Sequence, residues 1–178
     1  LRRQRQMCIR DSVNVAVVLS NNRNVGVHGR VNKLGVPSFV FSREEFIAGV
    51  PILEKLAEYD VCLIVLAGFM NKISDVILQA FPGKIVNIHP ALLPKYGGKG
   101  MYGMHVHEAV VKAGERESGI TIHYINEHYD EGAIIFQASC PVLPSDTPEE
   151  VASKVHALEY AHYPHAVSYT HLTLPTKL

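Results

Sequence analysis

Residues 84–96 read Lys-Ile-Val-Asn-Ile-His-Pro-Ala-Leu-Leu-Pro-Lys-Tyr, and they are the most informative part of the chain. The β-branched residues within 85–88 predict a buried strand, which Pro90 ends. Asn87 and His89 are two residues apart, so in an extended strand their side chains point to the same side. An amide donor and an imidazole can together stabilise an oxyanion and move a proton. The carboxyl end of a strand is also where open α/β sheets bind ligands.

The rest of the chain alternates strand patterns with helical patterns. The strand patterns cover 13–19, 37–41, 61–66, 84–88, 119–125 and 133–138. The helical patterns cover 24–34, 42–56, 75–81 and 105–113, and a last one begins after Thr147. This alternation predicts the α/β class, with a mostly parallel twisted sheet flanked by helices. The run 61–66 is apolar throughout, as expected for a central parallel strand.

Local signals predict where several of these elements begin and which faces they bury. Ser42 and Glu45 have the spacing of a capping box, and Pro51 kinks or restarts the helix that follows. Thr147 caps the last helix, whose first turn is acidic. One apolar face is predicted for the helix 105–113, formed by Val106, Ala109, Val110 and Ala113.

Charge and cysteine usage limit the possible partners. The chain has 17 basic and 17 acidic residues, so its formal net charge is zero and nothing indicates binding of nucleic acid or of an anionic membrane. No apolar run reaches transmembrane length. Cys62 and Cys140 have no C-x-x-C partner, which favours a reduced, cytoplasmic setting over a disulfide framework.

The two ends of the chain share an unusual relationship. Residues 2–12 and 167–176 can be encoded by one DNA sequence read on opposite strands, as in translated sequencing-adapter DNA. We therefore expect residues 1–12 and 167–178 to be non-native tails. Residues 13–166 are then expected to form a single domain, which is long enough to bury a core.

Four motifs carry a resemblance to a known family. The stretch Asn87-Ile88-His89-Pro90, followed by Leu-Leu-Pro-Lys-Tyr, resembles the signature of the folate-dependent formyltransferases. Leu-Ala-Gly-Phe-Met at 66–70, Gly-Ile-Thr-Ile-His at 119–123 and Tyr-Asp-Glu-Gly at 129–132 resemble further family motifs in the same order. The chain is most similar to the branch that acts on phosphoribosylglycinamide. The resemblance implies a Rossmann-like formyltransferase fold and transfer of a formyl group from 10-formyltetrahydrofolate to an amine in purine biosynthesis.

The resemblance also implies a catalytic set. Formyl transfer passes through a tetrahedral oxyanion, so the protein has to stabilise negative charge and move a proton. Asn87 is expected to donate a hydrogen bond to the oxyanion, and His89 is expected to act as a general acid. Asp130 matches the family's aspartate and is expected to orient His89 and favour its protonated form.

The remaining site residues are carried over from the family by position. The expected folate-binding residues, besides Asn87 and Asp130, are Arg43, Met70, Asn71, Lys72, Ile73, Asn126, Glu127, His128 and Tyr129. Glu159 and His123 are expected to bind the amine substrate. An arginine is common in the family where this chain has Asn71. Ordinary structural roles stay open for three of them: a solvated helix arginine for Arg43, a surface acid for Glu159 and a half-buried strand histidine for His123.

No metal site is predicted. His105 and His107 are two residues apart on a helix and do not share a face, and no third ligand follows at a useful spacing. Small molecules are the only partners expected, and the sequence predicts no oligomeric state. The segment 96–103 contains four glycines and is expected to be mobile, but no role is assigned to it.

One departure and several alternatives remain at this point. The family's first strand and the loop that holds the ribose phosphate are expected before Val13 and are missing there, so the chain is expected to be poorly soluble and inactive as a fragment. Alternatives within the family are a formyltetrahydrofolate hydrolase and a methionyl-tRNA formyltransferase domain. A non-catalytic folate- or nucleotide-binding α/β module is the alternative outside enzymes, and its mark would be a broken catalytic set.

Overall fold

The computed structural model describes residues 13–24 and 26–173, which divide into two compact units. The first unit comprises the chain up to Ile64 together with Lys72–Pro82. The second comprises Val65–Asn71 together with the chain from Gly83 onward. Strands and helices alternate through both units, so the α/β class predicted from the sequence is confirmed.

The first unit pairs two short parallel strands. They are β1 (Val18–Ser20) and β2 (Ser38–Val40), and α2 (Val27–Lys33) connects them. In this part of the chain the sequence predicts a longer strand, 13–19. The parallel pairing with β2 covers only Val18–Ser20, so the strand is shorter than predicted.

Three further helices belong to the first unit: α3 (Arg43–Ala48), α4 (Val50–Glu58) and α5 (Asp75–Ala80). The predicted capping box is confirmed, because Ser42 Oγ accepts from the Glu45 N–H at 3.1 Å and the Glu45 carboxylate accepts from the Ser42 N–H at 2.8 Å. The predicted restart near Pro51 is also confirmed. The break lies at Gly49, whose φ of 76° is left-handed, and an added Cβ would lie 2.6 Å from Ser74 Oγ.

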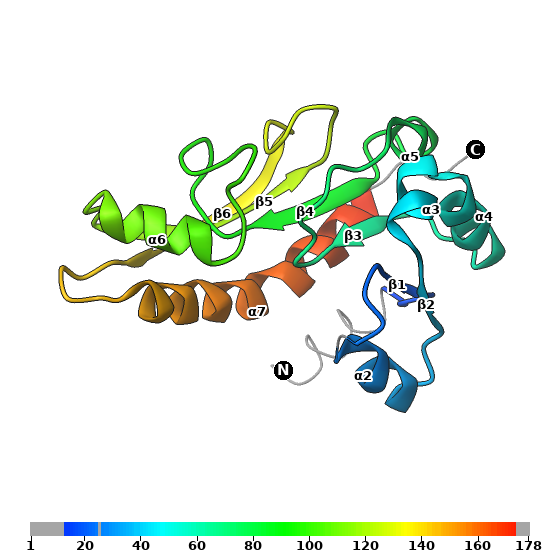
Figure 1. Cartoon of the computed structure of the whole chain (residues 1–178), viewed down its shortest axis with the longest axis horizontal. Coiled ribbons are helices and arrows are strands. Elements are labelled where there is room, and N and C mark those ends of the chain that lie inside the picture. The colour runs from blue at the N-terminus through cyan, green and yellow to red at the C-terminus, as the bar shows by residue number, and fades with distance from the viewer. Residues whose placement is uncertain (1–12, 25, 174–178) are drawn as a thin grey trace. The chain divides into compact units, whose positions relative to one another are not determined.

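The second unit is built on a sheet with the strand order β3-β4-β5-β6 (Figure 1). The strands are β3 (Ile64–Leu66), β4 (Ile85–His89), β5 (Glu117–Tyr124) and β6 (Ile134–Pro141). β4 pairs with β5 and β5 pairs with β6, both antiparallel, which adds antiparallel strands to the sheet. In the described part of the chain β3 is an edge strand, whereas its apolar run predicts a central one.

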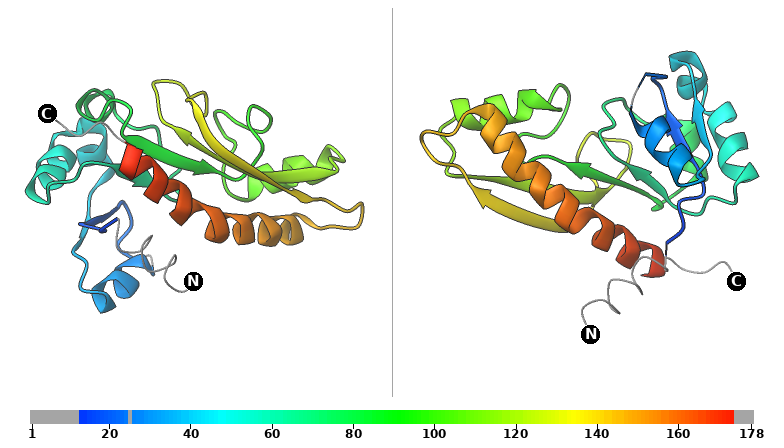
Figure 2. Two further views of the ribbon diagram at one scale, coloured as in Figure 1. Left: turned by 180° about the vertical axis from the view of Figure 1, so that it is seen from behind. Right: turned by 90° about the horizontal axis from the view of Figure 1, so that it is seen from below.

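Helices α6 (Met104–Lys112) and α7 (Pro148–Thr173) complete the second unit, and α7 runs along the sheet (Figure 2). All five residues of β4 are buried. The core side chains with at most 1% exposure include Ile85, Val86, Val106, Val110, Ile120, Ile122, Val151 and Val155. The predicted apolar face of α6 is wrong in one respect, because Ala113 is the exposed C-cap and the buried His107 takes its place in the core.

Helix α7 begins as the sequence predicts and then extends further. Thr147 and Glu150 form a second capping box, with bonds of 2.8 and 3.3 Å. The helix continues through Pro164 and past the predicted boundary at residue 166, and Val167 lies buried beyond it. The predicted tail 1–12 and residues 174–178 lie outside the described residues. None of the described helices combines the length and apolarity that a bilayer crossing demands.

Candidate active site

The pairing of β4 with β5 creates the site. Asn87 is opposite His123 and His89 is opposite Thr121 in the antiparallel register. Opposite residues in a sheet share a face, and residues two apart on one strand share it too, so all four side chains project to one side. All four are buried, with exposures of 9% or less. The sheet therefore places an amide, a hydroxyl and two imidazoles together in a dry environment.

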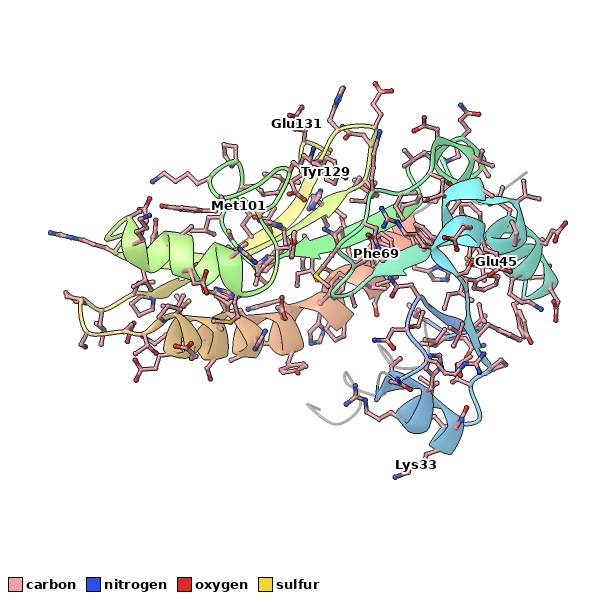
Figure 3. All side chains as sticks on the ribbon, in the orientation of Figure 1. Lys33, Glu45, Phe69, Met101, Tyr129 and Glu131 are labelled. Carbon is pink, nitrogen blue, oxygen red and sulfur yellow. The ribbon has the colours of Figure 1, made fainter. Side chains whose placement is uncertain are left out.

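The loop between β5 and β6 adds a carboxylate to this group. Asp130 Oδ2 lies 3.6 Å from His89 Nδ1, and Asp130 Oδ1 lies 3.7 Å from His123 Nε2. The loop turns tightly, because Asp130 has a left-handed φ of 56° and a Cβ added at Gly132 would overlap the Tyr124 carbonyl. Figure 3 labels Tyr129 and Glu131, which project from the same loop and are exposed. One carboxylate thus faces two imidazole rings.

The partners of His89 define its chemistry. Its Nε2 lies 2.7 Å from the backbone carbonyl oxygen of Tyr96, and its Nδ1 faces the carboxylate of Asp130. Both oxygens can only accept hydrogen bonds, whereas a neutral ring carries only one N–H. Nε2–H therefore donates to the Tyr96 carbonyl, and the carboxylate of Asp130 lies beside Nδ1, where it can orient the ring.

His123 is set up differently. Burial lowers its pKa, an effect that its bond to the Tyr124 carbonyl and the charge of Asp130 oppose. Its Nδ1 donates to that carbonyl at 2.9 Å, so in the neutral ring Nε2 is an acceptor, and Asn87 Nδ2 donates to it at 3.3 Å. This bond fixes the orientation of the Asn87 amide and leaves its second N–H for a ligand. The sequence predicts a substrate contact for His123, but its ring is fully buried and both of its nitrogens have protein partners.

The glycine-rich segment after Tyr96 belongs to the site, although the sequence assigns it no role. The Gly98 N–H donates to Asp130 Oδ2 at 2.8 Å, and a Cβ at Gly97 would lie 2.5 Å from Leu93 Cδ2. Tyr96 itself has a left-handed φ of 56°. The glycine pair is the only local signal for this role, because the bonded partner Asp130 is 32 residues away.

Thr121 holds the segment that follows His89. Its hydroxyl donates to the Ala91 carbonyl at 2.7 Å and accepts from the Leu93 N–H at 3.0 Å. Gln137 of β6 donates to Thr121 Oγ1 at 2.8 Å and to the Leu93 carbonyl at 3.1 Å. The turn beyond His89 is therefore anchored to two neighbouring strands.

The expected folate-binding residues are divided between the two units. Met70 and Asn71 follow β3 in the second unit and are exposed, as are the residues 126–129 of the β5–β6 loop. The others, Arg43, Lys72 and Ile73, belong to the first unit. There Arg43 is exposed at the start of α3, Lys72 is exposed and Ile73 is buried.

Glu159 lies on α7 in the second unit, and burial raises the pKa of its carboxyl. It is one turn before Tyr163, whose hydroxyl donates to the carbonyls of Leu66 at 2.6 Å and Val86 at 3.2 Å. These bonds hold this part of α7 against β3 and against β4, the strand that carries Asn87. Within 13–24 and 26–173 no cluster of three or more His, Cys, Asp or Glu side chains could hold a metal ion.

Comparison with known proteins identifies relatives over most of the chain. The profile of the formyl transferase family matches residues 1–167. Phosphoribosylglycinamide formyltransferase from Haemophilus influenzae is 38% identical over 154 residues, which cover 84% of this chain and 70% of that protein. The chloroplastic phosphoribosylglycinamide formyltransferase of Arabidopsis thaliana is 41% identical over 163 residues, which cover 88% of this chain and 56% of that protein. The chain thus spans about half the length of the plant relatives.

Solved structures agree with the sequence relatives. The crystal structure of phosphoribosylglycinamide formyltransferase from Anaplasma phagocytophilum matches with a TM-score of 0.83 and 36% identity, covering 91% of this chain and 75% of that one. The enzyme of the same name from Streptococcus pneumoniae matches with a TM-score of 0.80 and 35% identity, covering 90% and 89%. The sequence match, the shared fold and the buried group on β4 lead to one conclusion: the chain belongs to the formyl transferase family.

Proposed function

We propose that this chain carries the catalytic centre for transfer of a formyl group from 10-formyltetrahydrofolate to the amine of phosphoribosylglycinamide, a step of purine biosynthesis. The observation that carries the proposal is the convergence of Asn87, His89 and Asp130 in one unit, with Asp130 Oδ2 3.6 Å from His89 Nδ1. An amide donor, a proton donor and an orienting carboxylate are the three groups that this reaction requires.

The first step is attack on the formyl group. The amine nitrogen forms a bond to the formyl carbon, and the carbonyl electron pair moves onto oxygen. The Asn87 N–H that His123 leaves unused stabilises this oxyanion. Because the Asn87 side chain is buried, this hydrogen bond acts in a medium of low dielectric constant, where it stabilises charge strongly.

The second step is collapse of the tetrahedral intermediate. The bond between the formyl carbon and N10 of the folate breaks, and that nitrogen takes a proton from His89. The attacking amine, now carrying an extra proton, returns one to His89, so the net change is one proton moved from the amine to the folate. Asp130 orients the ring and stabilises its charge through both transfers.

Substrate binding is proposed from the exposed groups around this centre. The exposed loop residues Asn126, Glu127, His128 and Tyr129 and the strand-end residues Met70 and Asn71 would contact the folate. Arg43, Lys72 and Ile73 of the first unit remain candidates from the resemblance alone. Glu159, with its half-buried carboxyl on α7, would contact the substrate amine. We propose the cytoplasm as the compartment, a location that the cysteine spacing supports.

The test is a comparison of three formyl acceptors. Purified chain is supplied with 10-formyltetrahydrofolate labelled in the formyl carbon, together with phosphoribosylglycinamide, methionyl-tRNA or no acceptor. The catalytic group is complete within the described residues, so, against the sequence-based expectation of an inactive fragment, we expect label in formylated phosphoribosylglycinamide. Label in methionyl-tRNA would identify the sister transferase, and labelled formate without acceptor would identify a hydrolase. Binding of the folate without turnover of any acceptor would favour a non-catalytic binding module and overturn the proposal.

A further inference from the structure

A cluster of three side chains outside the reacting centre holds the backbone that contacts His89. Tyr96 Oη donates to Glu115 Oε1 at 3.0 Å, and Lys95 Nζ reaches the same oxygen at 2.9 Å. Glu115 follows the end of α6 and has a side chain that is 25% exposed. Its hydrogen bonds to Lys95 and Tyr96 lower the pKa of its carboxyl, and burial raises the pKa of the Tyr96 phenol. At neutral pH an ionised acceptor therefore meets a protonated phenol.

Tyr96 needs such an anchor because of its backbone. Its φ of 56° lies in the left-handed region, which costs a residue with a side chain about 1–2 kcal/mol. Conformations of this kind persist only where the surroundings fix them. In this conformation the Tyr96 carbonyl accepts from His89 Nε2 at 2.7 Å, while two residues later Gly98 N–H donates to Asp130. Glu115 thus holds the side chain of Tyr96, and the backbone carbonyl of Tyr96 holds the His89 ring.

Of the two residues bonded to Glu115, Tyr96 is the one that links Glu115 to His89. The Lys95 side chain is 68% exposed, and ion pairs in such surroundings contribute little. Tyr96 is less exposed and its own carbonyl contacts His89. We infer that Glu115 is a positioning residue for the proposed formyl transfer, acting through Tyr96 to fix the acceptor of the His89 Nε2–H. The inference rests on the proposed function for its catalytic meaning and on these bonds for its geometry.

The experiment compares three variants in two assays. Tyr96→Phe deletes only the hydroxyl, Glu115→Ala deletes its acceptor, and Glu115→Gln keeps an acceptor oxygen. The first two are expected to lower kcat about five- to thirtyfold, the effect of loosening one hydrogen bond, with KM for both substrates unchanged. Glu115→Gln is expected to recover most of the loss. In the same proteins the ¹⁵N chemical shift of His89 Nε2 should move with the first two variants and return with the third.

Matched controls separate positioning from general damage. Tyr102→Phe removes a hydroxyl from an exposed tyrosine of the same loop, and Glu108→Gln neutralises an exposed acid on α6. Both should leave kcat and the His89 signal unchanged. If Tyr96→Phe and Glu115→Ala also leave both unchanged, the inference is wrong. If Glu115→Ala fails to fold, Tyr96→Phe decides alone, because it removes a single atom.

The two assays also separate this inference from the proposed function. If the wild-type chain transfers no formyl group, but Tyr96→Phe and Glu115→Ala show the expected change of the His89 signal, the proposed function is refuted and the positioning role is supported. Normal transfer with an unmoved His89 signal in Tyr96→Phe would refute the positioning role alone.

Discussion

Two pairs of histidines lie in the second unit, and their surroundings differ. His89 and His123 share the carboxylate of Asp130, and each ring also has a backbone carbonyl as acceptor. His107 and His156, on α6 and α7, face each other with ring centroids 6.4 Å apart and ring planes at 81°. His107 is 2% exposed and its Nδ1 has no hydrogen-bond partner. Burial lowers the pKa of His107, as it lowers that of His123.

The two pairs show that burial and hydrogen-bond partners act differently on a histidine ring. Burial alone favours the neutral ring, which packs like any flat side chain of its size. A carboxylate and a carbonyl on opposite nitrogens orient the ring and supply acceptors for its N–H groups, even where burial lowers the pKa, as it does for His123. Only the pair around Asp130 is therefore equipped for acid–base chemistry, and the pair between the helices is a packing contact.

The largest effect should come from removing the acid. His89→Ala is expected to lower kcat about 10²- to 10⁴-fold, the usual contribution of a general acid or base. Measurement of kcat beside the melting temperature checks it, with His105→Ala as the control because that histidine is exposed on α6. Near-normal turnover in His89→Ala would remove the distinction between the two histidine pairs.

The oxyanion donor should rank next. Asn87→Ala removes the amide that His123 orients, and kcat is expected to fall about 10²- to 10³-fold, as for the loss of one oxyanion donor. Steady-state kinetics with both substrates measures it. A rise in KM with an unchanged kcat would instead assign Asn87 to substrate binding.

The carboxylate should matter less than the ring it orients. Asp130→Asn keeps the size of the side chain and removes the charge that faces both imidazole rings, so kcat is expected to fall about ten- to hundredfold. Glu131→Gln, the exposed neighbour, is the control in the same kinetic assay. Equal losses in both variants would argue for a general effect of loop charge.

The smallest effect concerns stability at the other histidine pair. Burial lowers the pKa of His107 in the folded state. The ring that faces His107 is that of His156, and the charges of His156 and His89 also lower the pKa of His107. The unfolded state therefore binds more protons than the folded state as pH falls below about 6.5. The free energy of unfolding decreases in that pH range. In wild type and His107→Phe, the free energy of unfolding is measured in urea between pH 7.5 and 5. The decrease with falling pH should be smaller in His107→Phe, by at most about 1.4 kcal/mol per pH unit.

The control for that experiment is His105→Phe, an exchange at the exposed histidine of the same helix, which should leave the slope as in the wild type. Activity at neutral pH should be normal in His107→Phe. A pH slope identical to the wild type would show that His107 takes up a proton in the folded state as readily as in the unfolded one.

The sequence predicted the parts of this molecule that depend on neighbours in the chain. The capping box at Ser42, the cap at Thr147, the restart near Pro51 and strand β4 follow from residues a few positions apart. Asn87 and His89 are visible in the same way, because strand alternation alone puts them on one side. The resemblance to the formyltransferases then directed attention to Asp130, which the structure brings to His89.

The features that the sequence missed depend on distant contacts. The burial of His107 is set by packing against α7, and the exposure of Ala113 by where α6 stops. The backbone roles of Tyr96 and Gly98 arise from partners that only the folded chain brings near. The extent of β1 is that of its pairing with β2, a contact between residues far apart in the chain.

The cross-strand register has one last consequence. Asn87 is matched to His123 and His89 to Thr121, so a slip of one residue between β4 and β5 would turn these groups to opposite sides of the sheet. A mispaired chain could keep its strands and helices, and look native by circular dichroism, without assembling the catalytic group. The fraction of turnover recovered after refolding would therefore measure the fraction of molecules in which β4 and β5 pair in the native register.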